Sequence, residues 1–397
     1  MRISTANRHD ETVASLQRRQ NELTQAQATL TTGKRISRAS DDPTGAARAE
    51  RAFIAQQRIG SEQRSVAASR SAMSLAESTL GQSVDLLQRA REGLVAAGNG
   101  SYSSHERAAL VADLRNLRSQ LLGLANREDG NGGHVFGGQT AASVPFQDTP
   151  GGVTTAAAGG RSELSSREQM PSTLDGAEIW LRARNGNGVF VTSANPANTG
   201  QAWINPGSVS DPAALTGDSY ALDFRVDADA TRYTVLRNGS PVAVDLSYQA
   251  GSAISIDGMS MTMRGSPATG DRFELAPSSA TLNPFAALDQ AITALANPSA
   301  GAGQVAQAVA SGLRDMDAVL GHVQAARSDA GVALTRLDAI DGRNQDSMLW
   351  AQTVQADAED ADMVAAVSTF QNKQTGYQAA LQSYSMVQRM SLLDFLK

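Results

Sequence analysis

The chain contains no cysteine and few aromatic residues. Of its 397 residues none is Cys, and Phe, Trp and Tyr together make up 5%. Without thiols there are no disulfides, no thiol catalysis and no thiolate metal sites. A chain poor in aromatics and rich in Ala, Gln, Ser and Thr suits long helices with small contact residues better than one dense globule.

Neither sign of charge dominates the sequence. The formal net charge is -6 and the signs are mixed, so the sequence shows no footprint for a nucleic-acid partner. One basic run, residues 34–38, is followed closely by Asp41 and Asp42. This pattern favours a solvated or subunit-facing loop.

Long apolar runs are also missing. No stretch approaches the ~20 apolar residues that a membrane span requires, so we expect no membrane insertion. Residues 1–7 lack the apolar core of a cleavable secretion signal. If the protein leaves the cytoplasm, we expect it to use another route.

A narrow apolar stripe runs through residues 12–31. Its members recur at alternating steps of three and four, the a and d spacing of a coiled coil, with glutamine at two positions. They are Val13, Leu16, Gln20, Leu23, Gln27 and Leu30. A surface helix on a globular core would show a wider stripe, so the narrowness favours a coiled coil.

The same spacing returns at the far end of the chain. Its members are Met363, Val367, Phe370, Gln374, Tyr377, Leu381, Tyr384, Gln388, Ser391 and Phe395, and Leu392 widens the face. Matching imperfect heptads at both ends predict that the two segments pair. Glutamines within such a seam favour one register of helix pairing at a cost in the stability of the pair. We therefore expect the ends to be largely unfolded in the free monomer and ordered by assembly.

Further helices are predicted between these ends. Asp41-Asp42-Pro43 is a helix-start signal, and the helix that follows is predicted over residues 43–97. Ser103 or Ser104 is expected to cap a second helix, residues 105–126. Helices are also predicted near residues 285–295 and 304–354.

The helical pattern stops at Gly130-Asn131-Gly132-Gly133, and a β region is predicted until about residue 282. Asn238-Gly239 and Asp257-Gly258 each lie between short alternating runs, which is a strong hairpin signal. A further strand is predicted at residues 272–275. Met259, Met261 and Met263 alternate on one strand face, where core filling is the favoured interpretation.

The predicted fold is therefore mainly α with an inserted β domain. The terminal helices form a coiled coil, a long antiparallel helical layer follows, and a small all-β domain lies at the centre. The expected divisions are a terminal assembly domain, a helical rod and a surface-exposed insert. Their boundaries are 1–40 with 360–397, 41–145 with 283–359, and 146–282.

No constellation of residues points to catalysis. The four histidines are scattered without ligand spacing, and the glycines at 130–133 follow a helix and lack a P-loop Lys-Ser/Thr. The acidic cluster Glu359, Asp360 and Asp362 has neither the ligand count nor the glycine of a calcium loop. We expect no enzyme activity, no cofactor and no metal.

Specific segments resemble the flagellin family. Residues 30–36 with 39–45, and residues 379–381 through 391–396, are similar to the family's motifs at its two ends. The segment from Gly132 to Thr140 with Pro145-Phe146, together with the ending SLLDFLK, looks more like hook-associated members than filament flagellins. Thr335 departs from the asparagine expected before Arg336-Leu337.

This resemblance implies a structural subunit at the junction between the hook and the filament of the bacterial flagellum. The implied partners are further copies in a homo-oligomeric ring, the other hook–filament junction protein, flagellin and a cytoplasmic export chaperone. The implied location is extracellular, after export unfolded through the flagellar type III apparatus. The residues expected to carry assembly are the two seams with Arg35, Asp41 and Asp42.

Two alternatives remain open from the sequence. The chain could be a filament flagellin, or the β insert could be adhesive or bind glycans. A hydrolytic insert is disfavoured because residues 146–282 contain no histidine.

Overall fold

The computed structural model describes residues 5–99, 102–140, 142–164, 168–227 and 230–395, with side chains placed between residues 10 and 386, Ser104 excepted. The chain divides into two compact units. Unit 1 comprises Met1–Arg64 and Ile340–Lys397, and unit 2 comprises Ser65–Ala339. Each unit is described by itself.

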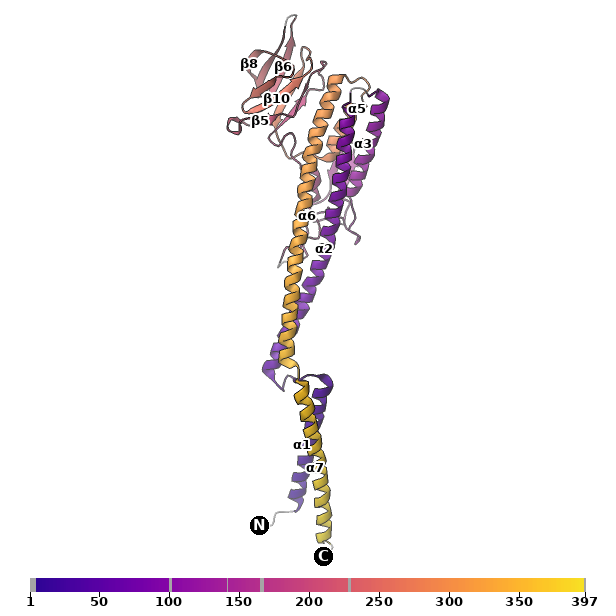
Figure 1. The fold of residues 1–397 in the computed structure, drawn as a ribbon, viewed down its shortest axis with the longest axis vertical. Coiled ribbons are helices and arrows are strands. Elements are labelled where there is room, and N and C mark those ends of the chain that lie inside the picture. The colour runs from indigo at the N-terminus through magenta and orange to yellow at the C-terminus, as the bar shows by residue number, and fades with distance from the viewer. Residues whose placement is uncertain (1–4, 100–101, 141, 165–167, 228–229, 396–397) are drawn as a thin grey trace. The chain divides into compact units, whose positions relative to one another are not determined.

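Six helices of thirteen residues or more occur among the described residues, and a short helix lies between them (Figure 1). They are α1 (Thr5–Thr32), α2 (Pro43–Ala97), α3 (Ser104–Ala125), α4 (Gly176–Leu181), α5 (Pro284–Ala296), α6 (Ala302–Glu359) and α7 (Met363–Phe395). The helices predicted at 43–97, at 105–126 and near 285–295 agree with α2, α3 and α5 to within one residue. Helix α1 begins seven residues before the predicted range of 12–31, and α6 ends five residues after the predicted range of 304–354. The prediction missed α4.

Local capping explains where several helices begin. Ser103 accepts a hydrogen bond from the Glu106 amide, and the Glu106 carboxylate accepts one from the Ser103 amide, which is a capping box. Asn283 accepts from the Ala286 amide and Pro284 follows at the first helical position. The sequence therefore sets these helix starts without help from distant residues.

The helical core of unit 2 is formed by α2, α3, α5 and α6. Leucines from these helices are fully buried together, and aromatic rings close the core. Trp180 packs edge-on to Phe136, with ring centroids 5.5 Å apart, and stacks on Phe285 at 6.2 Å. Such pairs add to the hydrophobic gain from burial.

The segment after α3 packs against this helical core. It carries the hairpin of β1 (Phe146–Thr149) and β2 (Gly152–Thr155), and then α4. The Asn126 amide both donates to the Phe146 carbonyl and accepts from its amide, each at 2.9 Å. Phe146 and Trp180 belong to the helical core. The first part of the predicted insert, from residue 146, thus packs with the helices.

The remaining strands form two antiparallel sheets around a second core (Figure 1). One sheet has the order β3-β11-β6-β7-β8, and in the other β10 pairs with β9 on one side and with β4 and β5 on the other. The strands are β3 (Phe190–Ala194), β4 (Trp203–Ile204), β5 (Ser208–Val209), β6 (Tyr220–Val226), β7 (Thr231–Arg237), β8 (Ser240–Ser247), β9 (Ala253–Ile256), β10 (Met259–Arg264) and β11 (Arg272–Pro277).

Both predicted hairpins and the predicted methionine face are confirmed. Asn238 and Asp257 have φ of 48° and 42°, and each is followed by a glycine of positive φ at a two-residue turn. Met259, Met261 and Met263 are all buried in the second core. The predicted fold class, mainly α with an inserted β domain, is confirmed by this arrangement.

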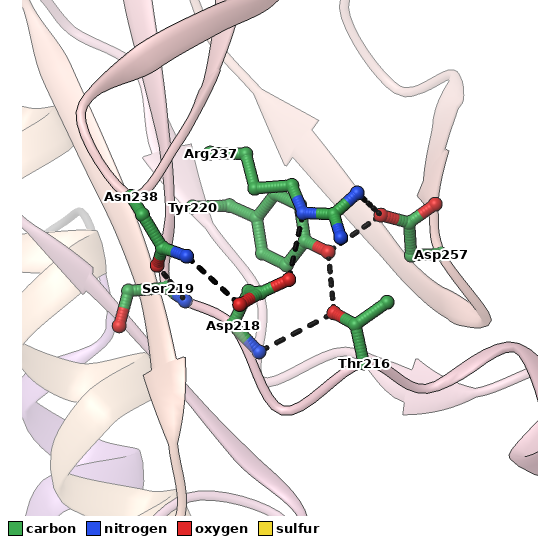
Figure 2. Close-up of polar contacts among 7 residues, drawn as sticks. All are labelled: Thr216, Asp218, Ser219, Tyr220, Arg237, Asn238 and Asp257. Carbon is green, nitrogen blue, oxygen red and sulfur yellow. Dashed lines mark hydrogen bonds and ion pairs between the residues drawn. The ribbon is translucent and has the colours of Figure 1, made fainter.

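A polar cluster ties the two sheets together at the turn of β9 and β10 (Figure 2). The Tyr220 hydroxyl donates to Asp257 at 2.5 Å, and Arg237 pairs with Asp218 at 2.6 Å. Asn238 also donates to Asp218, and this bond is the main reason that the pKa of Asp218 lies below its ordinary value. Burial is the main cause of the raised pKa of Tyr220. The internal pairing of these groups points to a structural cluster.

The two hairpin glycines provide a matched test of this fold. Gly239 and Gly258 both have positive φ, so alanine at either position should cost about 1 kcal/mol. A Cβ at Gly258 would also overlap the Asp211 carbonyl, whereas one at Gly239 meets nothing. We expect Gly258→Ala to destabilise the insert by at least about 1 kcal/mol more than Gly239→Ala.

The measurement is hydrogen-exchange protection of peptides from β10 along a urea titration of each variant. Equal loss of protection in both variants would contradict the packing of this turn.

Candidate assembly surface

Unit 1 brings the two ends of the chain together. Helices α1 and α7 lie side by side (Figure 1). A salt bridge joins Glu22 to Lys373 at 2.7 Å, and it is the first cause of the lowered pKa of Glu22. The facing side chains are only half-buried. They are Val13, Leu16, Leu23 and Leu30 on α1, and Phe370, Tyr377 and Tyr384 on α7.

The other predicted seam positions lie outside this contact. Gln20 and Gln27 are exposed on α1. On α7, Met363, Val367 and Leu381 are between 42% and 47% exposed. The partly buried positions on α7 include instead small or flexible residues near the aromatic rings, namely Ala366, Lys373 and Ala380. Leu392 and Phe395 fall within α7, but their side chains lie outside the described residues.

None of the described side chains of α1 or α7, residues 10–32 and 363–386, is fully buried. Half-buried aliphatics gain only part of the free energy that full burial would supply. Each ordered residue still loses backbone entropy. The α1–α7 pair therefore leaves apolar side chains such as Val364 and Met386 exposed.

Backbone hydrogen bonds link the segment between α1 and α2 to the segment between α6 and α7. We call this contact, formed by residues 33–36 and 359–361, the joint. Lys34 and Asp360 form an antiparallel bridge. The Arg35 amide donates to the Glu359 carbonyl at 2.7 Å, and the Ala361 amide donates to the Gly33 carbonyl at 2.9 Å. Main-chain bonds thus hold together segments that are far apart in the sequence.

Charged side chains close the same joint. Lys34 pairs with Glu359 at 2.8 Å, and this bond is the first cause of the lowered pKa of Glu359. Arg35 donates to the Ala358 carbonyl at 2.8 Å and reaches Asp42 at 3.3 Å. Arg35 therefore connects α2 and α6 within one chain.

Asp41 and Asp42 organise the turn that precedes α2. Asp42 accepts from the Gly45 amide at 2.9 Å, which is the first cause of its lowered pKa. Asp41 accepts from the Arg38 amide at 2.9 Å, which likewise lowers the pKa of Asp41. Gly45 is buried, and a Cβ there would meet Ile36 and Asp42. The contacts of Arg35, Asp41 and Asp42 that the structure shows are internal.

Sequence reasoning missed Lys34 and Glu359 as partners. The basic run and the acidic cluster were both visible, but they lie 325 residues apart. Their opposite charges next to predicted helix ends are the one signal that could have paired them.

A cleft of about 470 Å³ lies between β3 and helices α5 and α6. Amide, hydroxyl and alanine side chains line it with the buried Arg314–Asp315 pair, and none of the lining residues is a histidine. Within the described residues no group of three His, Cys, Asp or Glu could hold a metal ion. Among those same residues no helix is apolar enough over sufficient length to cross a bilayer.

Two stretches of the chain match family models. Residues 3–141 match the bacterial flagellin N-terminal helical region. Residues 193–277 match the D2-like domain of flagellar hook-associated protein 1. The second match coincides with the strands around the second core.

Individual proteins of known structure or function are similar over most of this chain. Flagellar hook-associated protein 3 of Escherichia coli K12 is 25% identical over 403 residues, covering 100% of each chain. The crystal structure of hook-associated protein 3 from Legionella pneumophila superposes with a TM-score of 0.70 at 27% identity, covering 76% of this chain and 97% of that one. A flagellar junction protein from the same organism gives a TM-score of 0.66 at 28% identity, covering 72% and 99%.

The chain is therefore similar to structural proteins of the flagellin family, whose N-terminal helical region it matches over residues 3–141. It is similar over its full length to flagellar hook-associated protein 3 of Escherichia coli K12. The resemblance inferred from the terminal motifs is confirmed.

The joint should weaken in acid. The pKa of Glu359 lies below its ordinary value of 4.5 because Lys34 donates to it. A lowered carboxyl pKa stabilises the folded form above the ordinary value, and this contribution is lost as the pH falls through the folded value. Protection of residues 33–36 and 359–362 from hydrogen exchange should therefore drop as the pH falls below about 4.5.

In Glu359→Gln the joint should be weaker at pH 7, by about 0.5–1 kcal/mol. It should also respond less to acid, because only carboxylates such as Asp42 still titrate there. Asp346→Asn, which removes an exposed carboxylate elsewhere on α6, should behave as the wild type. An unchanged acid response in Glu359→Gln would disprove the role of this pair.

Proposed function

We propose that this chain is a hook-associated structural subunit that forms the junction between the flagellar hook and filament. The observation that carries the proposal is the end-to-end similarity to hook-associated protein 3, which includes the β insert as well as the terminal helices. If the chain were a filament flagellin, we would expect its similarity to hook-associated protein 3 to be confined to the terminal helices. The similarity extends through the β insert, which favours the junction subunit.

The mechanism we propose is completion of the terminal helices by neighbours. The half-buried seam of α1 and α7 leaves apolar side chains such as Met363 and Leu381 in contact with water. A neighbouring subunit that covers them would supply the burial that the isolated pair lacks. The seam residues, Arg35, Asp41 and Asp42 are thus proposed to act together in assembly.

The partners follow from this role. Copies of the chain would form a ring, with the other hook–filament junction protein on one side and flagellin on the other. Before export through the flagellar type III apparatus, a cytoplasmic chaperone would hold the terminal helix. The absence of thiols agrees with passage in an unfolded state, because no cross-link could form on the way.

The proposed role is mechanical and requires no catalysis. We propose a terminal assembly domain of residues 1–40 and 360–397, a helical rod, and an outward-facing β insert. The structure of the second core favours residues 190–275 as the independent part of that insert.

Deletion of the ends tests this function. A chain lacking residues 1–40 or 360–397 should be absent from detached flagella, and the cells should lose filaments and motility. The β insert should stay folded, with its hydrogen-exchange protection unchanged, because its core lies entirely within unit 2. Normal incorporation of either truncated chain into flagella would disprove the proposal.

A further inference from the structure

An acidic stripe with an exposed tryptophan runs along α6 in unit 1. Asp346, Trp350, Thr353 and Asp357 are spaced by four, three and four residues, which places them on one helix face. Trp350 is 69% exposed, and the adjacent Leu349 is 65% exposed. A large indole surface left in water between two carboxylates is typical of a contact surface.

A basic stripe of matching character runs along α2 in the same unit. Arg51, Ile54 and Arg58 follow one another at three and four residues and share one face. All three are exposed, Ile54 by 58%. This stripe is the counterpart of the first, with an aliphatic side chain between two cations.

The four charges of these stripes have no partner within the described part of the chain. Neither Arg51 nor Arg58 forms an ion pair there, and neither does Asp346 or Asp357. The faces of α2 and α6 that are turned inward are occupied by other residues. These are Ala52, Gln56 and Ile59 on α2, and Asn344, Ala351 and Gln355 on α6. Both stripes therefore face away from the helix pair.

The geometry of a ring brings one stripe to the other. Within unit 1, α2 and α6 are antiparallel, as the 2.6 Å bond between Gln56 and Gln355 and the joint beside it require. Copies related by rotation about an axis that runs along the helices point the same way, so in such a ring α2 of one copy runs antiparallel to α6 of the next.

The spacing along the two helices also matches. Arg51 and Arg58 are about two turns apart, as are Trp350 and Asp357. When Arg51 lies opposite Asp357, Arg58 therefore lies at the level of Trp350. A guanidinium over an indole face is a favourable cation–π contact, and Ile54 then lies between the two polar contacts.

We propose that neighbouring copies dock laterally through these stripes, with the basic stripe of α2 on one copy against the acidic stripe of α6 on the next. The partner is a second copy of this chain, and the contact is heterologous, so it continues around a ring. The proposal rests on the proposed function, which is what places copies side by side. It adds the surface by which each copy recognises the next.

Charge reversal tests the pairing. Asp346→Arg/Asp357→Arg makes both stripes basic, and Arg51→Asp/Arg58→Asp makes both acidic. Either variant, expressed alone in cells that lack the wild-type chain, should be reduced at least about tenfold in detached flagella because like charges meet. Circular dichroism of each purified variant checks that it is folded.

Co-expression of the two variants should restore incorporation to within about twofold of wild type. Basic and acidic copies can then alternate, so contacts again join opposite charges, with one like-charged contact left where the ring has an odd number of copies. Failure of the pair to recover, with each variant folded, would overturn the proposal.

The cysteine-free chain permits a direct measurement of proximity. Copies carrying Arg51→Cys and copies carrying Asp357→Cys are expressed together, and intact flagella are oxidised. Cross-linked dimers should exceed by at least about tenfold those from the control pair of Arg51→Cys with Gln352→Cys, since Gln352 is exposed on another face of α6. Equal yields in the two pairs would count against the stripe contact.

The outcomes separate this proposal from the function on which it rests. If the wild-type chain is found in detached flagella but neither rescue nor selective cross-linking occurs, the junction role stands and the stripe contact is wrong. If the wild-type chain is absent from flagella, both proposals fail together.

Discussion

The central physical constraint is that two terminal helices can bury only one side of each other. Helices α1 and α7 meet along a single seam, and no described side chain on either helix becomes fully buried. Phe370 and Tyr377 turn toward α1, while Met363 and Leu381 remain in water. The joint at residues 33–36 and 359–361 holds this incomplete pair in register.

The joint fixes that register. Backbone bonds between Gly33 and Ala361, and between Arg35 and Glu359, set the point from which both helices start. Individual exposed ion pairs contribute little to stability, so the Lys34–Glu359 pair alone would not hold the ends together. Main-chain bridging, the Arg35 contact to the Ala358 carbonyl and the caps at Asp41 and Asp42 act together.

Unit 2 contains two separate hydrophobic cores. Its helical core is closed by Phe136, Phe146, Trp180 and Phe285, and the strands from β3 to β11 enclose a second core. The buried Arg314–Asp315 pair connects the two, since Arg314 also donates to the Thr192 carbonyl of β3 at 2.6 Å. An insert with its own core can differ in sequence without disturbing the packing of the helices.

Much of the fold could be predicted because it depends on neighbours in the sequence. Asp42-Pro43 starts α2, Ser103 caps α3, and Asn238-Gly239 and Asp257-Gly258 form hairpins, each through contacts within a few residues. The terminal motifs likewise carried the family resemblance. Capping and turn chemistry are local, so a linear sequence contains them in full.

Other features were decided only by the tertiary structure. The heptad pattern marked an apolar stripe on α7 but did not show which edge of the stripe faces α1. Such a pattern locates the contact face of a helix only to within a fraction of a turn. The pairing of Lys34 with Glu359 and the burial of Phe146 beside Trp180 also join distant segments. Local patterns in the sequence were enough to predict the long helices, the hairpin turns and the family resemblance. Which side chains these elements bury and which they leave exposed emerged only in the folded chain, because burial depends on surfaces that meet in space.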